Sequence, residues 1–355
     1  PWSAVSAGMK TAEDLGVAVR LLAERGQLGE DERRWIERTV ALTEPGHVWR
    51  AVADLCLRHP ADWQAPLLLS MLGVAPVADT ELVYALRLAL KSQVAAATPA
   101  ALQGWAETVL GAAGRLADVA MAVPSPVAAE YLLGHLERTS FSDERSGEYA
   151  RHVVQHLAPE RMVLVDALIR SLDQAPTAHQ VALAEGLASA AVRPDRPLPT
   201  AARAWMARVL LGTLADKDRV LARRAAEALR ELELPEKVIP LAKIAESPEN
   251  EYGLRFVAIR GLPADTPEGA AVLGTVLGRA TDSVHLRKLA AVQLGLKPGD
   301  AGARAALVAG LPGSPVDLAL SIATALAKGE AGARELVAVV AAGRAPASLL
   351  RHRNL

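Results

Sequence analysis

A helical pattern of apolar residues is repeated three times between residues 218 and 296. The three segments read DRVLARRAAEAL, EYGLRFVAIRGL and SVHLRKLAAVQL, and their arginines lie 32 residues apart. Each arginine is followed by a small residue and then by a large apolar one: Arg223, Ala226 and Leu229; Arg255, Ala258 and Leu262; Arg287, Ala290 and Leu294. A fixed period of this length is typical of repeat proteins, in which each unit buries its apolar face against its neighbours.

A fourth copy follows at the same step without the arginine. It reads SPVDLALSIATAL and carries Ala319 in place of the arginine, followed by Ile322 and Leu326 at the two apolar positions. The segments between the copies also have helical periodicity, so the predicted unit is a helical hairpin. We therefore predict an all-α fold, a right-handed α-solenoid of about nine or ten hairpins with next to no strand.

Helices are also expected throughout the N-terminal half, although they follow no fixed period. Thr11 precedes the first of them, and Thr98-Pro99 and Ser125-Pro126 each place a capping hydroxyl before a proline at the first helical position. The predicted helices span residues 12–25, 30–44, 47–58, 62–73, 79–94, 98–110, 112–123, 125–138, 144–157, 161–173 and 178–191.

The clearest break in the pattern is the segment 192–200, VRPDRPLPT, which contains three prolines. Proline removes a backbone donor and restricts φ where two hairpins must dock. We predict an irregular helical-hairpin array over 1–192 and regular repeats over 200–355, joined in one continuous solenoid. The halves are expected to be separable, with the first proteolytic cut between Val192 and Thr200. Because the chain begins at proline without an initiator methionine, we also expect it to be a fragment of a longer protein.

Composition and charge narrow the function classes. Apolar residues make up 51% and aromatic residues only 3%, which suits helices packed through alanine and leucine better than sheets. Lys and Arg total 39 against 40 Asp and Glu, and proteins that mainly bind phosphates usually carry a basic excess. A dedicated nucleic-acid binder is therefore disfavoured, although a local basic stripe stays open. The single cysteine, Cys56, is compatible with a reducing compartment and with an exported protein, so it does not indicate where the protein is located. No apolar run is long enough to predict a transmembrane helix.

The regular copies resemble HEAT repeats. In that family the second helix typically begins with Asp-x-x-Val-Arg and continues with small residues and leucines. Asp218 with Val220, and Asp282 with Val284 and Arg287, fit this pattern loosely. The resemblance covers roughly the C-terminal 140 residues and implies a solenoid of HEAT-like hairpins.

Two further stretches resemble the HEAT region of large planctomycete-type multidomain proteins. They are DTELVYALRLALKSQV (79–94) and LVAVVAAGRAPASLL (336–350). In that family a β-propeller resembling a sugar dehydrogenase precedes the HEAT region and a c-type cytochrome domain follows it. The resemblance implies an exported, periplasmic or extracytoplasmic scaffold between redox modules. This chain contains no Cys-x-x-Cys-His motif, so we expect neither haem attachment nor another cofactor within it.

One group of residues has metal-ligand spacing. Glu148, His152 and His156 stand one helical turn apart in GEYARHVVQHLAPE. Two histidines one turn apart can share a metal, and a carboxylate one turn earlier could supply a third ligand. No fourth ligand is apparent, and such spacing is common on solvated helix faces, so we expect no physiological metal.

The repeated arginines Arg223, Arg255 and Arg287 should stack along one face of the regular repeats. They could form a track for anions or acidic peptides. We favour a structural role, in which each arginine caps backbone carbonyls or pairs with an acid in the adjacent loop.

The sequence carries no sign of catalysis: it has no Gly-x-Ser-x-Gly elbow and no Walker loop. We expect a non-catalytic scaffold that binds a protein partner or neighbouring domains of its own chain. The alternative is a HEAT-like nucleic-acid-binding protein or a DNA glycosylase-like enzyme, which needs a basic face with aromatic and acidic residues around an extruded base. Four of the six tryptophans lie far from the regular repeats, at Trp2, Trp35, Trp49 and Trp63.

A gel-shift assay separates these alternatives. We expect no shift of duplex DNA or RNA at low salt, because the chain has no cationic excess to release counterions from phosphates. Strong binding at low salt that falls steeply as salt is added would favour the nucleic-acid alternative.

Overall fold

The computed structural model describes residues 9, 11–25, 28–138, 145–172, 174–191 and 197–351. Within these ranges the chain is all-α and has no strand, as predicted. Contacts divide it into two compact units, unit 1 up to Gln174 and unit 2 from Ala175. In the described ranges no helix has both the length and the apolar character needed to span a membrane.

Unit 1 contains the helices of the N-terminal half of the chain. Its helices are α2 (Ala12–Arg25), α3 (Glu30–Leu42), α4 (His47–Arg58), α5 (Gln64–Val74), α6 (Thr80–Ala96), α7 (Pro99–Thr108), α8 (Ala112–Ala120), α9 (Pro126–Arg138), α10 (Ser146–His156), the 3-10 turn η1 (Pro159–Arg161) and α11 (Val163–Ser171). The predicted bounds of α2 and α4 are confirmed, and the others differ by a few residues.

Side-chain caps explain where several of these helices begin. The hydroxyl of Thr11 accepts a hydrogen bond from the Asp14 amide at 3.1 Å. Thr98 accepts from the Ala101 amide and Ser125 from the Ala128 amide, both at 3.2 Å. The three predicted caps are confirmed, and each satisfies an amide that a helix start otherwise leaves unpaired.

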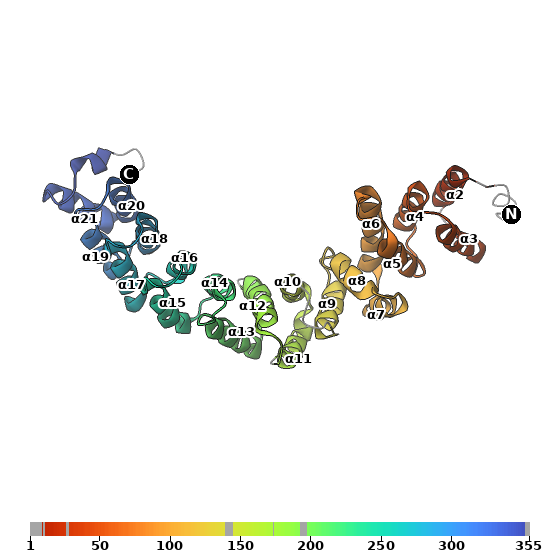
Figure 1. Ribbon diagram of the computed structural model, residues 1–355, viewed down its shortest axis with the longest axis horizontal. Coiled ribbons are helices and arrows are strands. Elements are labelled where there is room, and N and C mark those ends of the chain that lie inside the picture. The colour runs from red at the N-terminus through yellow and green to blue at the C-terminus, as the bar shows by residue number, and fades with distance from the viewer. Residues whose placement is uncertain are drawn as a thin grey trace. The chain divides into compact units, whose positions relative to one another are not determined.

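Unit 2 holds the regular repeats. Its elements are α12 (Thr177–Ala191), α13 (Thr200–Thr213), α14 (Arg219–Arg230), η2 (Pro235–Lys237), α15 (Val238–Glu246), α16 (Tyr252–Gly261), α17 (Pro267–Gly278), α18 (Val284–Leu294), α19 (Ala301–Gly310), α20 (Val316–Leu326), α21 (Glu330–Ala341) and η3 (Ala347–Arg351). Each helix from α14 to α19 contacts the second helix after it in the chain, and within hairpins α15 packs on α16 and α17 packs on α18. The helices therefore form two layers: an even layer of α14, α16, α18 and α20, and an odd layer of α15, α17, α19 and α21 (Figure 1).

The repeated apolar positions form the core between these helices. Ala226, Ala258 and Ala290 are buried, as is Ile322 at the equivalent position of the fourth copy, and so are the large residues that close each copy, Leu229, Leu262, Leu294 and Leu326. Small residues stand where two helices of the even layer approach closely. At the end of α18 a Cβ on Gly295 would lie only 2.7 Å from the Cβ of Ala325 in α20. The repeated apolar positions of the sequence are therefore the positions that this packing buries.

The boundary between the two units differs from the one predicted at 192–200. Residues 192–196 lie outside the described residues, but the helices on either side of the segment, α12 and α13, contact each other, and α12 also contacts α14. The guanidinium of Arg224 in α14 donates twice to the Glu185 carboxylate in α12, at 2.9 and 2.5 Å. Interhelical packing thus continues past the prolines, and α12 belongs with the regular repeats.

The stability of fragments tests this boundary. We expect a fragment that begins at residue 175 to unfold at a higher temperature than one that begins at residue 200, because the second fragment leaves α13 and α14 without α12. Thermal unfolding followed by circular dichroism measures the difference. Equal unfolding temperatures, together with a first proteolytic cut in 192–200, would support the boundary predicted from the prolines.

A buried leucine tests the core of the regular repeats. Leu262 is 3% exposed, so Leu262→Ala should lower the free energy of unfolding by about 2–5 kcal/mol. Leu296→Ala is the matched control, since Leu296 is 57% exposed and its truncation should change that free energy by less than about 0.5 kcal/mol. Denaturant unfolding of both variants measures the effect, and similar values would contradict the predicted burial.

Candidate binding surfaces

Four exposed apolar side chains recur once per hairpin along the even layer. Val220, Tyr252, Val284 and Val316 lie 32 residues apart, each in the first turn of its helix. Their exposed fractions are 56%, 48%, 40% and 79%. Single exposed apolar residues are normal on a protein surface. One at the same position of four successive repeats is a pattern, and we call these four residues the apolar row.

Aromatic rings extend the apolar row at α16 and α18. The ring of Tyr252 lies 6.2 Å from that of Phe256 and 6.2 Å from that of His285, and Phe256 lies 5.7 Å from His285. The guanidinium of Arg260 lies 5.7 Å from the centre of the Phe256 ring. Contacts of this kind hold rings in fixed orientations, so the surface here is both aromatic and ordered.

Unit 1 has a groove of about 320 Å³ between α6, α8 and the start of α10. Cationic, aromatic and aliphatic side chains surround a single carboxylate, that of Asp118. The lining residues are Tyr84, Arg87, Leu88, Lys91, Asp118, Val119, Ala122 and Arg145.

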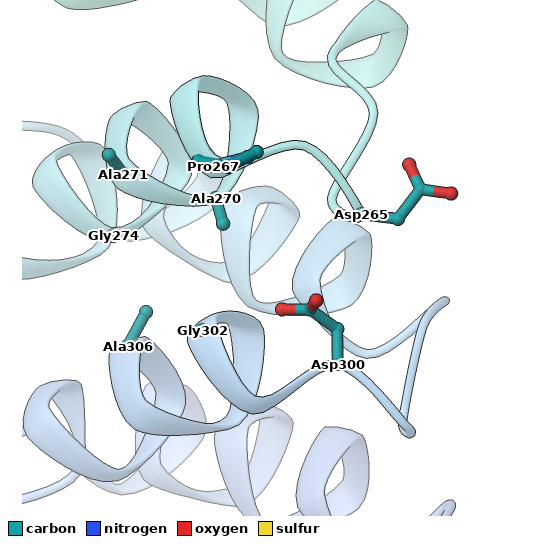
Figure 2. Close-up of a pocket in the computed structure, with 8 residues that line it drawn as sticks. All are labelled: Asp265, Pro267, Ala270, Ala271, Gly274, Asp300, Gly302 and Ala306. Atoms are coloured by element: carbon teal, nitrogen blue, oxygen red, sulfur yellow. The ribbon is translucent and has the colours of Figure 1, made fainter.

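A second hollow, of about 460 Å³, lies between α17 and α19 in unit 2 (Figure 2). Figure 2 shows a wall of small residues with Asp265 and Asp300 at one end. Both carboxylates have structural partners. Asp265 pairs with Lys297 at 2.7 Å, and this hydrogen bond lowers the pKa of Asp265. Asp300 accepts the Ala303 amide at 2.7 Å and caps α19. The hollow therefore offers no uncommitted acid to a ligand.

The three repeated arginines do not share one environment. Arg255 is 5% exposed and donates to both oxygens of Asp282, at 2.7 and 2.9 Å, and to the Ala245 carbonyl at 3.1 Å. Arg287 donates to the Leu277 carbonyl at 2.8 Å. Ala245 and Leu277 lie in the last turns of α15 and α17, where carbonyls lack helical partners. Arg223 is exposed and lies near Gly253.

A buried lysine makes a similar contact one hairpin earlier. The ammonium group of Lys237 donates to the carbonyls of Leu229, Arg230 and Leu232 at 2.9, 3.2 and 2.5 Å. These carbonyls lie at the C-terminal end of α14, where a cation is favourable. Burial lowers the pKa of Lys237, while Glu231 and Glu233 act in the opposite direction. Cations thus close the ends of three helices of unit 2, α14, α15 and α17.

Helix α10 brings His152 and His156 together but engages Glu148 elsewhere. The two imidazole rings lie 4.5 Å apart, whereas the Glu148 carboxylate is exposed and pairs with Arg145 at 3.3 Å. The solvated-face interpretation therefore fits Glu148 but not His152, which is buried. Within the residues that the structure describes, no group of three or more His, Cys, Asp or Glu side chains could hold a metal.

Sequence reasoning missed the apolar row and the groove. The row is visible in the sequence as an apolar residue three positions before each repeated arginine and before Ala319, but the pattern alone does not show that the position is exposed. The groove left a weaker signal, because Tyr84, Arg87, Leu88 and Lys91 share one face of a helix. Their partners come from α8 and α10, which no local pattern connects with α6.

Comparisons with known proteins identify no family. No family model matches the chain, and no curated protein is similar enough to count as a match. One similar solved chain is described as the crystal structure of an engineered protein from the Northeast Structural Genomics Consortium. It is 20% identical over 97% of this chain and 91% of that one, with a TM-score of 0.39. This likeness is too weak to carry an argument, and nothing in these comparisons links the chain to the propeller and cytochrome family that residues 79–94 and 336–350 resemble.

The two environments of the repeated arginines predict different costs of truncation. Arg255→Ala should lower the free energy of unfolding by about 3 kcal/mol, because it leaves the Asp282 carboxylate buried without its main partner. Arg279, at 3.7 Å from that carboxylate, offsets only part of the loss. Arg223→Ala removes an exposed side chain at the same repeat position and should cost less than about 0.5 kcal/mol. Equal costs in denaturant unfolding would show that the arginines act alike.

The buried imidazole of His152 predicts acid sensitivity. Burial, aided by His156 and opposed by a hydrogen bond with the Val123 backbone, lowers the pKa of His152 from 6.5 to about 4. Below pH 6.5 the unfolded chain therefore takes up the proton first. The contribution of neutral His152 to the free energy of unfolding is therefore complete above pH 6.5. It is lost as the pH falls through about 4, and the loss is at most about 3 kcal/mol.

Unfolding measured across this pH range should therefore show a shallower acid slope for His152→Gln than for the wild type. His285→Gln, which changes an exposed imidazole, is the control and should keep the wild-type slope. A His152→Gln slope equal to that of the wild type would contradict the prediction.

Proposed function

We propose that this chain is a non-catalytic scaffold, a right-handed solenoid of HEAT-like helical hairpins that binds a protein through the even layer of unit 2. The observation that carries the proposal is the apolar row, with one exposed apolar side chain on each of four successive hairpins. A row of this kind gives a partner regularly spaced contacts across several repeats. The partner is a separate protein or a neighbouring domain of the same chain.

The contacts of unit 2 support the solenoid. Each helix from α14 to α19 packs on the second helix after it, and α15 with α16 and α17 with α18 pack as hairpins, which is the pattern of a one-dimensional array. Arg255, Arg287 and Lys237 satisfy carbonyls within this array. Because the array holds itself together by local contacts, exposed positions on its surface are free to carry recognition.

The chemistry of the apolar row favours a protein partner. Aromatic residues are enriched at the centres of protein interfaces, and Tyr252 and Phe256 form the ordered part of this surface. The repeated arginines support a nucleic-acid site poorly, since Arg255 is buried against Asp282 and Arg287 donates to a carbonyl. The proposal does not depend on the resemblance to the propeller and cytochrome family.

Selection from a displayed peptide library tests the proposal. We expect the immobilised chain to select peptides that bind the wild type and lose at least about tenfold in affinity when Val220, Tyr252, Val284 and Val316 are all changed to serine, because the apolar contact area is removed. The matched control changes two exposed apolar residues of the odd layer, Ile239 and Val337, to serine.

The control variant should keep the wild-type affinity. Selected peptides that bind the wild type and the apolar-row variant equally, or that lose affinity only with the control variant, would place the binding surface elsewhere. Circular dichroism of both variants shows whether the fold is retained.

A further inference from the structure

One face of α6 points into the groove of unit 1 while the opposite face forms core. Tyr84, Arg87, Leu88 and Lys91 follow the spacing of a single helix face and line the groove. Leu82, Leu86 and Leu90 lie on the other face and are fully buried. The leucines therefore hold helix α6 in place, and the four side chains that face the groove are not part of this core.

Asp118 of α8 organises the cations of this groove. Its carboxylate accepts hydrogen bonds from the guanidinium of Arg87 at 3.3 Å, from that of Arg145, and from the Tyr149 hydroxyl at 2.8 Å. The carboxylate is 25% exposed, whereas the two arginines are 50% and 46% exposed. One carboxylate thus holds two guanidinium groups from different helices at the rim of the same groove.

The lining carries more positive than negative charge. Arg87, Lys91 and Arg145 share the lining with a single acid, Asp118, and among the described residues Arg145 also pairs with Glu148. Apolar surface lies beside the cations, since Tyr84 is 68% and Leu88 37% exposed. Val119 and Ala122 complete the lining.

We propose that this groove binds an acidic peptide segment. The carboxylates of the segment pair with Lys91 and Arg87, and an adjacent apolar side chain packs on Tyr84 and Leu88. Charge-assisted hydrogen bonds from guanidinium and ammonium groups to carboxylates are among the stronger polar contacts. This site lies in unit 1 and is independent of the apolar row in unit 2.

The size and charge of the groove favour a peptide over nucleic acid. A nucleic-acid strand presents a charge at every phosphate and is usually held by a long track of cations. Here three cations surround a space of about 320 Å³ with a carboxylate among them. That arrangement matches a few carboxylates next to an apolar side chain.

Fluorescence anisotropy with a defined peptide tests the proposal. The probe is a fluorescein-labelled peptide in which pairs of glutamates alternate with single leucines, and the full chain is titrated into it at low salt. Binding should weaken by roughly tenfold for the double variant Arg87→Glu with Lys91→Glu, because both carboxylate partners are reversed in charge. It should also weaken in salt near 1 M, where the screening length falls to about 3 Å.

Two controls make the result specific. Arg20→Glu reverses one charge at an exposed position of α2 and should change the affinity by less than about twofold, since α2 is far from the groove in sequence and does not line it. Tyr84→Ala should weaken binding without changing the circular dichroism, because this side chain is exposed. A peptide with lysine in place of glutamate should not bind.

Three outcomes would overturn the proposal. The first is no binding of the acidic peptide by the wild-type chain at low salt. The second is binding that the double variant retains at full strength while its circular dichroism is that of the wild type. The third is tighter binding of single-stranded RNA of mixed sequence that the double variant abolishes, which would make the groove a nucleic-acid site.

Discussion

Close packing between successive helices of the even layer is the constraint on which the structure of unit 2 depends. Ala226, Ala258 and Ala290 are buried at the repeated position, and Ile322 is buried at the equivalent position of the fourth copy. At the end of α18 Gly295 leaves no room for a Cβ beside Ala325 of α20, so a larger residue there would force the two helices apart. Burial of the same positions in every copy accounts for the strict spacing of the C-terminal copies. The exposed residues of the same helices are spaced by the same packing.

Closing the helix ends is the second requirement of this architecture. Each helix leaves backbone carbonyls without helical partners in its last turn. In unit 2 long cationic side chains supply the missing donors: Lys237 at the end of α14, Arg255 at α15 and Arg287 at α17. A long side chain can reach back across the turn to these carbonyls. Two of the three repeated arginines, Arg255 and Arg287, thus help to close helix ends within the array.

Much of the fold was predictable because its determinants are local. The caps at Thr11, Thr98 and Ser125 and the apolar spacing of each segment fix helix starts and buried faces within a few residues. The boundary between the two compact units, after Gln174, was not predictable in the same way as the helices. Prolines indicate a break in the helix, but they do not show that Arg224 and Glu185 join the helices on either side. The candidate sites were harder to predict from the sequence, because they depend on tertiary structure. Tertiary structure decides whether Val220 or Tyr252 is exposed and whether Arg87 contacts Asp118.

The apolar row has a consequence for how such a surface can change over time. Each hairpin contributes one exposed apolar side chain, at a position fixed by the 32-residue step. Gain or loss of a whole hairpin would lengthen or shorten the apolar row by one residue and would leave the spacing of the other residues unchanged. Gain or loss of a single helix would exchange the two layers for all hairpins that follow it. The number of contacts that this surface offers to a partner can therefore change only by whole hairpins.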